Sequence, residues 1–406
     1  MHIKEVTTED ARFQLEPGEG SDAVHSSPQY SFAVTHIVLD NGLQGTGLVL
    51  TMGTGNDLVC GAIRLLAQRL VGMELEALMA GFAMAFRDMA DDPQLRWLGP
   101  HKGVVHLALA SITNACFDIW AKSRQEPLWS LLLSLSPEAF VNLLDLSFLE
   151  DVLDRETAIG MLQEQQSLRE ARCEILHRGY PGYDTSVGWF QFDDAQIREN
   201  VQRSLDQGFG AFKLKVGGSL DRDLQRAANL RKLVGPEATL MFDANQQWSL
   251  PQAIVACKEL AALRPLWIEE PTHPDDIAAH RKLAVEIAPL ALALGEHVPN
   301  RVVFKNYLEA GCVGFLQPDC TRLGGVSEFL TVSLLARKYN VPVVPHVGDM
   351  GQIHQHLVLV NHIAMGHSEI FLEHIPHLSH YFAHPVQLSG GHYCTPQVPG
   401  SSSDLL

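Results

Sequence analysis

The chain has 406 residues, and at roughly 100 to 200 residues per domain this length predicts two domains, or one large domain with a smaller one attached. Its 30 Lys and Arg residues stand against 47 Asp and Glu residues, which gives a formal net charge of −17. A surface this acidic disfavours binding to nucleic acid or to anionic lipid, so we expect neither as a partner.

Membrane-spanning and secreted proteins are the next classes that the sequence disfavours. The longest strongly apolar stretch without a charged side chain, residues 104–117, is shorter than the roughly 18 to 20 residues that a membrane span needs, so we expect a buried helix there. No apolar segment follows the first charged residues, so we expect no signal peptide. The seven cysteines include no C-x-x-C pair, which predicts free thiols in a reducing compartment, the cytoplasm.

The first 140 residues predict strands followed by helices. Two runs of β-type residues, Phe32–Leu39 and Gly45–Thr51, are separated by residues 40–42 (Asp-Asn-Gly), which favour a hairpin turn because Asn and Gly tolerate positive φ. Apolar residues at helical spacing predict helices over Leu58–Val71 and Val104–Lys122. Residues 1–140 are therefore the first expected domain, an α+β unit.

A regular alternation of strand and helix follows, and residues 141–375 are the second expected domain. Helices such as Pro251–Leu263 and Val326–Tyr339 separate short apolar runs, which predicts βαβ units and a parallel sheet. Eight such strands favour a closed (β/α)8 barrel over an open sheet. The expected strands are Tyr183–Gly188, Phe212–Val216, Thr239–Phe242, Leu266–Ile268, Leu290–Leu294, Val313–Leu316, Val341–Val344 and Glu369–Leu372.

The C-terminal segment, residues 376–406, does not continue the alternation. Val386–Leu388 and Gly391–Cys394 predict a short strand pair, which we expect to pack back on the first domain. The three serines at 401–403 predict a frayed tail.

Ionisable residues stand at or near the C-terminal end of each expected strand after the first, two on the second strand and one on each of the others, at intervals close to the length of one βα unit. In a (β/α)8 barrel this face carries the active site, so these side chains should share one pocket. They are Lys213 and Lys215, Asp243, Glu269, Glu296, Asp319, His346 and Glu373.

Three carboxylates on adjacent strands, Asp243, Glu269 and Glu296, offer hard oxygen ligands that suit Mg²⁺. Without a divalent cation, carboxylates this close would repel one another or bind protons. A single carboxylate at a strand end more often caps the next helix. Three carboxylates at the same position of three successive βα units favour a metal site. The adjacent Glu270 is the alternative to Glu269 as a ligand.

Two lysines and a histidine are the candidates for proton transfer. Lys213 and Lys215 point to the same side of one strand, and we expect each ammonium to lower the pKa of the other toward the range of a base. Asp319 and His346 on neighbouring strands can pair, which fixes the imidazole tautomer. The alternatives are interior ion pairs of the lysines with Glu373 or Asp243, and a histidine that is merely part of the core.

Other motifs carry less weight. His354 and His356 are spaced so that they do not share a helix face, and the run His374, His377, His380 and His384 is more typical of a surface cluster than of a metal site. The glycines of residues 45–47 and 53–55 do not open a βαβ unit, so we interpret them as turn glycines and not as a dinucleotide-binding motif.

Together these residues resemble the enolase superfamily, and within it the mandelate racemase subgroup and the L-fuconate dehydratases. Enzymes of the enolase superfamily are a well-known case in which a Lys or His base acts together with Mg²⁺ that stabilises an ene-diolate. The similarity extends over almost the whole chain. It rests on residues 94–100 (QLRWLGP), 179–181 (GYP), 185–186 (TS), 213–215 (KLK), 243–245 (DAN), 267–272 (WIEEPT), 295–297 (GEH), 300–305 (NRVVFK), 322–325 (RLGG) and 399–400 (PG).

The resemblance implies an N-terminal α+β capping domain, a modified (β/α)7β barrel, Mg²⁺, and dehydration of an aldonic acid to a 2-keto-3-deoxy acid. On this reading Lys215 removes the C2 proton and His346, held by Asp319, protonates the departing 3-hydroxyl, although these two roles could be exchanged. The side chains expected to support the oxyanion or to bind substrate are Lys213, a protonated Glu373, Asn245, His297 and Arg322.

The exact substrate stays open because residues 345–352 (PHVGDMGQ) depart from the more glycine-rich turn of L-fuconate dehydratases, on the expected leaving-group side of the pocket. L-Fuconate, L-lyxonate, L-galactonate and D-arabinonate are the candidates. The alternatives are a racemase or epimerase with the same groups, a Schiff-base aldolase, and a barrel kept only for binding. An acidic barrel enzyme of this kind is expected to be a homo-oligomer.

Overall fold

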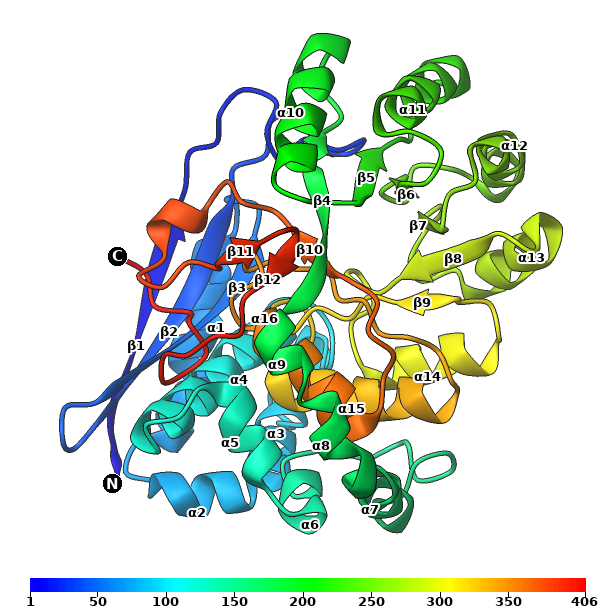
Figure 1. Cartoon of the computed structure of the whole chain (residues 1–406). Coiled ribbons are helices and arrows are strands. Elements are labelled where there is room, and N and C mark those ends of the chain that lie inside the picture. The colour runs from blue at the N-terminus through cyan, green and yellow to red at the C-terminus, as the bar shows by residue number, and fades with distance from the viewer.

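The N-terminal part of the chain is a three-stranded antiparallel sheet covered by helices. The computed structural model describes all residues 1–406, and Figure 1 shows the sheet (blue) beside the barrel (green to orange). The predicted hairpin is confirmed, and the strand order β1-β2-β3 places the unpredicted strand β1 beside β2. The elements are β1 (Ile3–Arg12), β2 (Ser31–Leu39), β3 (Gln44–Thr51), α1 (Asn56–Ala67), α2 (Leu75–Ala80), α3 (Phe82–Ala90), α4 (Gly103–Ser123), α5 (Leu128–Ser134) and α6 (Pro137–Val141).

Helix α4 is the buried helix that the apolar stretch predicted. By length and composition alone it could cross a membrane, but 89% of its apolar window is buried inside the protein. It lies so close to β3 that a Cβ atom on Gly47 would be 2.2 Å from the backbone nitrogen of Ala115, and one on Gly45 would be 2.4 Å from the Cβ of Ile119. The interpretation of Gly45 and Gly47 as turn glycines is therefore wrong, because both lie within β3 and make room for the helix.

The expected parallel barrel is confirmed. Strands β4 to β9 pair in chain order, β10 pairs with β4, and the expected strand at 341–344 makes a single bridge from Val343 to Leu316. Helices α10 to α16 alternate with these segments, and no helix of this set follows β10, which is the (β/α)7β pattern. The elements are α7 (Arg155–Glu164), α8 (Arg169–Arg172), α9 (Ile175–Arg178), β4 (Tyr180–Gly188), α10 (Asp194–Asp206), β5 (Ala211–Lys215), α11 (Leu220–Val234), β6 (Thr239–Asp243), α12 (Leu250–Leu260), β7 (Trp267–Glu269), α13 (Ile277–Ile287), β8 (Ala291–Leu294), α14 (Arg301–Glu309), β9 (Phe315–Leu316), α15 (Val326–Lys338), α16 (His354–Val360) and β10 (Leu372–His374).

A layer of apolar side chains inside the barrel sets the height of the polar residues above it. Side chains on a strand alternate between two faces, so the residue two positions after an inward residue also points inward. Lys213 follows the buried Ala211 in this way, and Glu269 follows the buried Trp267. The members of this layer are Tyr183, Ala211, Met241, Trp267, Ala293 and Val344.

The C-terminal segment divides between the barrel and the N-terminal sheet region, and Figure 1 shows it (red) lying between them. Strands β11 (Leu388–Ser389) and β12 (His392–Tyr393) form the expected pair, but β12 pairs with β4 of the barrel and not with the first domain. Farther on, the backbone N–H of Ser401 donates to Asp118 of α4 at 2.7 Å. Residues 401–403 are buried, so the expectation of a frayed tail is wrong.

A buried network of ionisable side chains joins α4 to the barrel helices. His106 of α4 lies 2.7 Å from Glu328 of α15, and Glu328 lies 3.0 Å from Arg301 of α14. The same guanidinium lies 2.6 Å from Asp145. None of these four side chains is more than 2% exposed, so the network fixes the N-terminal helices over the barrel.

Candidate active site

A cavity of about 290 Å³ opens at the C-terminal ends of the barrel strands, where the sequence predicted the site. Barrel residues form one wall and residues of the N-terminal part close the other. The barrel side comprises Trp189, Lys215, Asn245, Gln246, Glu296, His297, Arg322, His346, Glu373 and Ile375, and the N-terminal side comprises Asp22, Val24, His25, Tyr30, Leu50 and Met52.

The two lysines of β5 are brought to this site at different depths. Lys215 lines the cavity and its Nζ lies 2.5 Å from Asp243 Oδ2. Lys213 lies below the cavity, fully buried, with its Nζ 2.6 Å from Glu269 Oε1 and 2.8 Å from Glu373 Oε1. The expected direct contact of Lys213 with substrate is therefore not offered by this arrangement.

The expected lowering of the lysine pKa values is wrong. Burial is the largest effect and opposes the charge of Lys215, but the carboxylates of Asp243, Glu296 and Asp22 together outweigh burial and the neighbouring ammonium and raise the pKa of Lys215. For Lys213 too, the facing carboxylates outweigh burial and hold its pKa well above the ordinary value. The alternative, interior ion pairs of the lysines with Glu373 and Asp243, is what the structure shows.

The three carboxylates predicted to bind a metal each face a basic group. Asp243 pairs with Lys215, Glu269 pairs with Lys213, and Glu296 Oε2 lies 2.9 Å from the His346 Nε2. Trp267 Nε1 also donates to Glu269 at 3.0 Å. The three carboxylates thus lie around the floor of the site.

The chemistry of this set fits a divalent cation. Burial, together with the nearby Asp243 and Glu373 carboxylates, raises the pKa of Glu269 to about 8 although Lys213 opposes it, so a cation beside this carboxylate would stabilise its charged form. Glu296 Oε2 is buried and accepts no hydrogen bond. Its 2.9 Å contact with His346 Nε2 is an ion-pair contact without the geometry of a hydrogen bond. Carboxylate oxygen ligands suit Mg²⁺.

Glu270 lies beside this set and contacts His297. The backbone at Glu270 has a positive φ of 41°, which turns its carboxylate away from the strand direction and places it 3.0 Å from His297 Nδ1. Although burial opposes its charge, Glu270 and Glu296 raise the pKa of His297 to about 10. The ligand atoms of Glu270, Glu296 and His297 lie within 4.8 Å of one another, so the alternative that names Glu270 stays open.

The expected carboxylate–histidine pair is present. His346 Nδ1 lies 2.7 Å from Asp319 Oδ2, and the His346 ring lines the cavity. Although burial raises the pKa of the Asp319 carboxyl, His354 and His346 outweigh it and hold that pKa well below the usual range. Asp319 is thus an anion that orients His346.

Glu373 also lines the cavity, but not in the protonated form that the sequence analysis expected. Lys213 and His346 outweigh burial and lower the pKa of Glu373, and Thr185 Oγ1 donates to Glu373 Oε1 at 2.5 Å. The second oxygen, Oε2, is buried and has no hydrogen-bond partner. Glu373 therefore offers an acceptor to the cavity rather than a donor.

The residues 22–30 that close the cavity were not predicted. Asp22 and His25 pair at 3.0 Å and line the cavity together with Tyr30. Asn245 and Arg322 face them from the barrel side, as expected for substrate-binding residues. The only sequence signal for the first group was an Asp and a His three residues apart in a polar loop, which is too common to indicate a site.

The turn at residues 348–350 does not itself line the cavity, although His346 of the same segment, the expected leaving-group acid, does. It lies behind the histidine, where the backbone N–H of Gly348 donates to Asp319 Oδ2 at 2.8 Å. Asp349 and Met350 are buried. This turn therefore acts on the site through the support of His346.

Known proteins are similar to this chain over nearly its whole length. Residues 196–405 match the family model described as Enolase C-terminal domain-like. "Mitochondrial enolase superfamily member 1" of Homo sapiens is 39% identical over 413 residues, which cover 99% of this chain and 93% of that protein. Its crystal structure superposes on this chain with a TM-score of 0.97 at 38% identity, covering 100% of this chain and 94% of that one.

Two further relatives are informative. "L-galactonate dehydratase" of Hypocrea jecorina is 39% identical over 394 residues, covering 95% of this chain and 88% of that protein. The crystal structure of a racemase from Streptomyces coelicolor with bound magnesium is 25% identical, has a TM-score of 0.78, and covers 99% of this chain and 97% of that one.

Proposed function

The chain belongs to the enolase superfamily, and we propose that it is a Mg²⁺-dependent hydro-lyase that dehydrates an aldonic acid to a 2-keto-3-deoxy acid. The observation that carries the proposal is the meeting of Lys215, His346 and Glu296 at one cavity. Asp243 and Asp319 contact this lysine and histidine from behind, and Glu269 contacts the buried Lys213. Relatedness to a sugar acid dehydratase along 95% of the chain supports the reaction class.

Lys215 is the proposed base at C2. It lines the cavity beside Asn245 and Trp189, and its Nζ faces Asp243. A lysine accepts a proton only in its neutral form, and the Asp243 carboxylate contributes most among the groups that favour the charged form of Lys215. Asp243 therefore sets the protonation state of the base.

His346 is the proposed acid that protonates the departing 3-hydroxyl. Asp319 holds its Nδ1 and so directs Nε2 toward Glu296 and the cavity. Loss of the C2 proton and of the 3-hydroxyl as water leaves an enol, which becomes the 2-keto-3-deoxy acid when C3 takes up a proton. The roles of Lys215 and His346 exchange if the configuration at C2 is opposite.

The remaining groups fix the substrate and its charge. Mg²⁺ bound by Asp243, Glu269 and Glu296 would supply positive charge beside the substrate carboxylate, where negative charge develops as the C2 proton leaves. Lys213 would act from below by fixing Glu269 and Glu373. The side chains that face the substrate hydroxyls are Asp22, His25, Asn245, His297, Arg322 and Glu373.

The proposed substrate is L-fuconate, L-galactonate or a similar acid such as L-lyxonate or D-arabinonate. The name of the Hypocrea jecorina relative supports L-galactonate, and the residues quoted in the sequence analysis support L-fuconate. The second candidate function is racemisation or epimerisation at C2, because a lysine and a histidine that face one cavity can serve as two bases.

A screen of purified protein against these acids tests the proposal. Product is detected as the semicarbazone of a 2-keto-3-deoxy acid, with Mg²⁺ present in one set of samples and EDTA in the other. We expect a Mg²⁺-dependent signal with at least one acid. An equal signal in EDTA would contradict the metal assignment, and no signal with any of the acids would contradict the substrate class.

The cellular setting is part of the proposal. All seven cysteines are free, which supports a reducing compartment, and we propose the cytoplasm. We propose residues 1–140 as the capping domain, 141–375 as the barrel domain, and a homo-oligomer as the assembly. Light scattering on the purified protein measures the assembly directly.

A further inference from the structure

A second histidine, His354, lies behind the proposed acid and contacts the same carboxylate. Its Nε2 is 3.2 Å from Asp319 Oδ1, while His346 Nδ1 is 2.7 Å from Asp319 Oδ2. On its other side, His354 Nδ1 is 2.6 Å from Asp349 Oδ1. Asp319, His354 and Asp349 are all fully buried. A continuous row thus runs from the cavity into the core.

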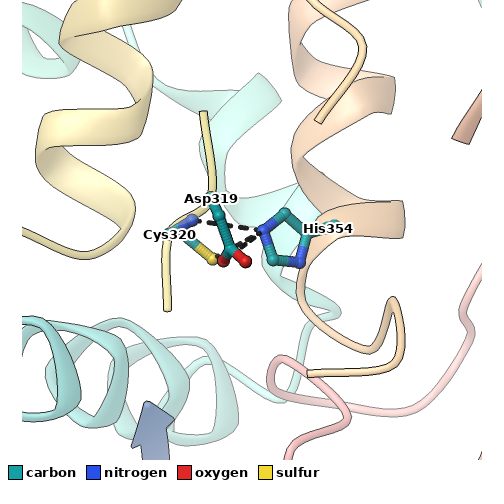
Figure 2. A group of neighbouring side chains, drawn as sticks. All are labelled: Asp319, Cys320 and His354. Carbon is teal, nitrogen blue, oxygen red and sulfur yellow. Dashed lines mark hydrogen bonds and ion pairs between the residues drawn. The ribbon is translucent and has the colours of Figure 1, made fainter. Parts of the chain in front are cut away.

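Backbone N–H groups hold both His354 and Asp349, the two residues of this row that lie farthest from the cavity. Asp349 accepts hydrogen bonds from the N–H groups of Gly351 at 3.0 Å and Ile353 at 2.7 Å, so its carboxylate is fixed at the start of α16. His354 Nε2 also lies 3.2 Å from the backbone nitrogen of Cys320, the residue after Asp319. Figure 2 shows the His354 ring facing Asp319 and Cys320.

His354 contacts residues 319–320 in either protonation state. A charged ring pairs with the Asp319 carboxylate, and a neutral ring accepts the N–H of Cys320. Both interactions fix the residue that orients His346. Burying an ionisable group costs free energy unless the group is paired. If packing were the only role of His354, an apolar side chain would fill this space at a lower cost in free energy.

The chain between the two histidines is short and constrained. Met350 has a φ of 59°, in the left-handed region that a non-glycine residue rarely adopts. A Cβ on Gly348 would lie 2.5 Å from Thr321 Oγ1 and 2.8 Å from Asp319 Oδ2. The turn therefore packs closely against Asp319. Because the turn connects the two histidines, the position of His354 is coupled to that of His346.

The same side chains have the composition of a metal site, but their bonding argues against one. Ligand atoms of Asp319, Cys320 and His354 lie within 4.8 Å of one another. Metals bind the thiolate, whereas burial raises the pKa of Cys320 to about 12 and keeps it a thiol. Asp319 Oδ1 already accepts hydrogen bonds from the N–H and the hydroxyl of Thr321, both at 2.7 Å.

We propose that His354 and Asp349 are positioning residues that hold Asp319, and through it His346, in the geometry for proton transfer. This inference rests on the proposed function for its kinetic consequence, but not for its structural one. His354 touches no group that lines the cavity except through Asp319, so its loss should affect turnover more than substrate binding.

The test compares His354→Leu and His354→Gln with His356→Leu as a matched control. His356 lies on the same helix and is equally buried, but its recorded partners are Trp129 and Ser402, not Asp319. We expect His354→Leu to lower kcat by about 10- to 100-fold with KM changed less than about 3-fold. This is the range typical when a residue that supports a functional side chain is lost, or when a catalytic group is displaced slightly. His354→Gln should recover part of kcat, and His356→Leu should keep it.

A measurement independent of activity completes the test. In protein labelled with ¹⁵N-histidine, the His346 signal is assigned by its loss in His346→Asn, and its Nδ1 shift reports the bond to Asp319. We expect this shift to change in His354→Leu and to stay unchanged in His356→Leu. Zinc analysis of the purified protein should find none bound at this cluster.

Wild-type kcat and an unchanged His346 signal in folded His354→Leu would overturn the inference, as would equal losses in His354→Leu and His356→Leu. Stoichiometric zinc that is lost in His354→Leu would replace the positioning role with a metal site. If the wild-type protein dehydrates none of the acids while the His346 signal responds as expected, the proposed function fails and the positioning role stands.

Discussion

Lys215 and His346 are the two side chains on which turnover depends most directly. We expect Lys215→Ala and His346→Asn each to lower kcat by about 10²- to 10⁴-fold, the range typical of lost general acid–base catalysis. Lys258→Ala is the control, because Lys258 is half exposed and pairs only with Glu286 on the surface. Steady-state kinetics with circular dichroism checks both activity and folding. Near wild-type turnover in either folded variant would refute the role of that residue.

Buried neutral histidines should make stability depend on pH. Burial lowers the pKa of His367 to about 4, although its contact with the Ser333 carbonyl opposes this. Between pH 6.5 and 4 the unfolded chain therefore binds the proton more readily, and the folded state loses stability as the pH falls. His367→Gln removes this dependence.

We expect the difference in unfolding free energy between wild type and His367→Gln to shrink by about 2 kcal/mol from pH 7.5 to pH 5. Urea titrations of both proteins at the two pH values measure it. Parallel pH dependence of the two proteins would contradict the neutral, buried state of His367.

At this scale the sequence predicted which residues meet but not their charges. The strand-end residues recur once per βα unit. This regular spacing was sufficient to predict that Lys215, Glu296 and His346 line one cavity. The protonation of Glu373 and of the lysines depends on how many opposite charges face them, which spacing does not give. Asp22 reaches the cavity only through the placement of the N-terminal part over the barrel.

The contact of α4 with β3 is the most demanding packing between two elements. Gly47→Ala should destabilise the protein by about 1 to 3 kcal/mol, because the added methyl meets the helix backbone. Gly160→Ala is the matched control: Gly160 is helical and has nothing within 4 Å of the added atom, so the change should be neutral or stabilising by about 0.5 to 1 kcal/mol. Urea unfolding of both variants measures the difference, and equal stabilities would contradict the close contact.

The alternation of elements was predictable because helices and strands differ in their hydrophobic period. Helix α15 and strands β5 and β6 lie within a residue or two of their expected bounds. The partner of β12 was not predictable, since a two-residue strand carries no information about the strand that it joins. Strand β1 was missed because its sequence, residues 3–12, is rich in charge and mostly exposed.

The cap and the barrel are joined in the whole molecule by the buried charge network around Arg301. Arg301→Met should cost about 3 to 5 kcal/mol of unfolding free energy, because two buried carboxylates each lose a charged partner. Asp145 then keeps only Arg87, and Glu328 keeps only His106. Lys305→Met on the same helix is the control, since its partner Asp151 is largely exposed and such pairs contribute about 0 to 1 kcal/mol. Denaturant titration of both variants decides the matter, and equal small losses would show that the network does not hold the two parts together.

Counting strands and helices predicted an α+β unit and an eight-stranded barrel, and the resemblance to the enolase superfamily implied the capping role and the (β/α)7β pattern. Neither predicted how the cavity is closed. A capping domain and a barrel were expected, but the loop at residues 22–30 and the burial of residues 401–403 depend on contacts between parts of the chain that are far apart in sequence. Those contacts bring the polar groups of the cap to the cavity, where they face the proposed substrate.

The most direct test of the central claim is a ¹H NMR time course of the enzyme with Mg²⁺ and an aldonic acid, L-fuconate or L-galactonate, in D₂O. We predict loss of the C2 proton and growth of a 2-keto-3-deoxy acid that carries one deuterium at C3. Recovery of the acid with deuterium and inverted configuration at C2, without a keto product, would contradict dehydration and identify an epimerase.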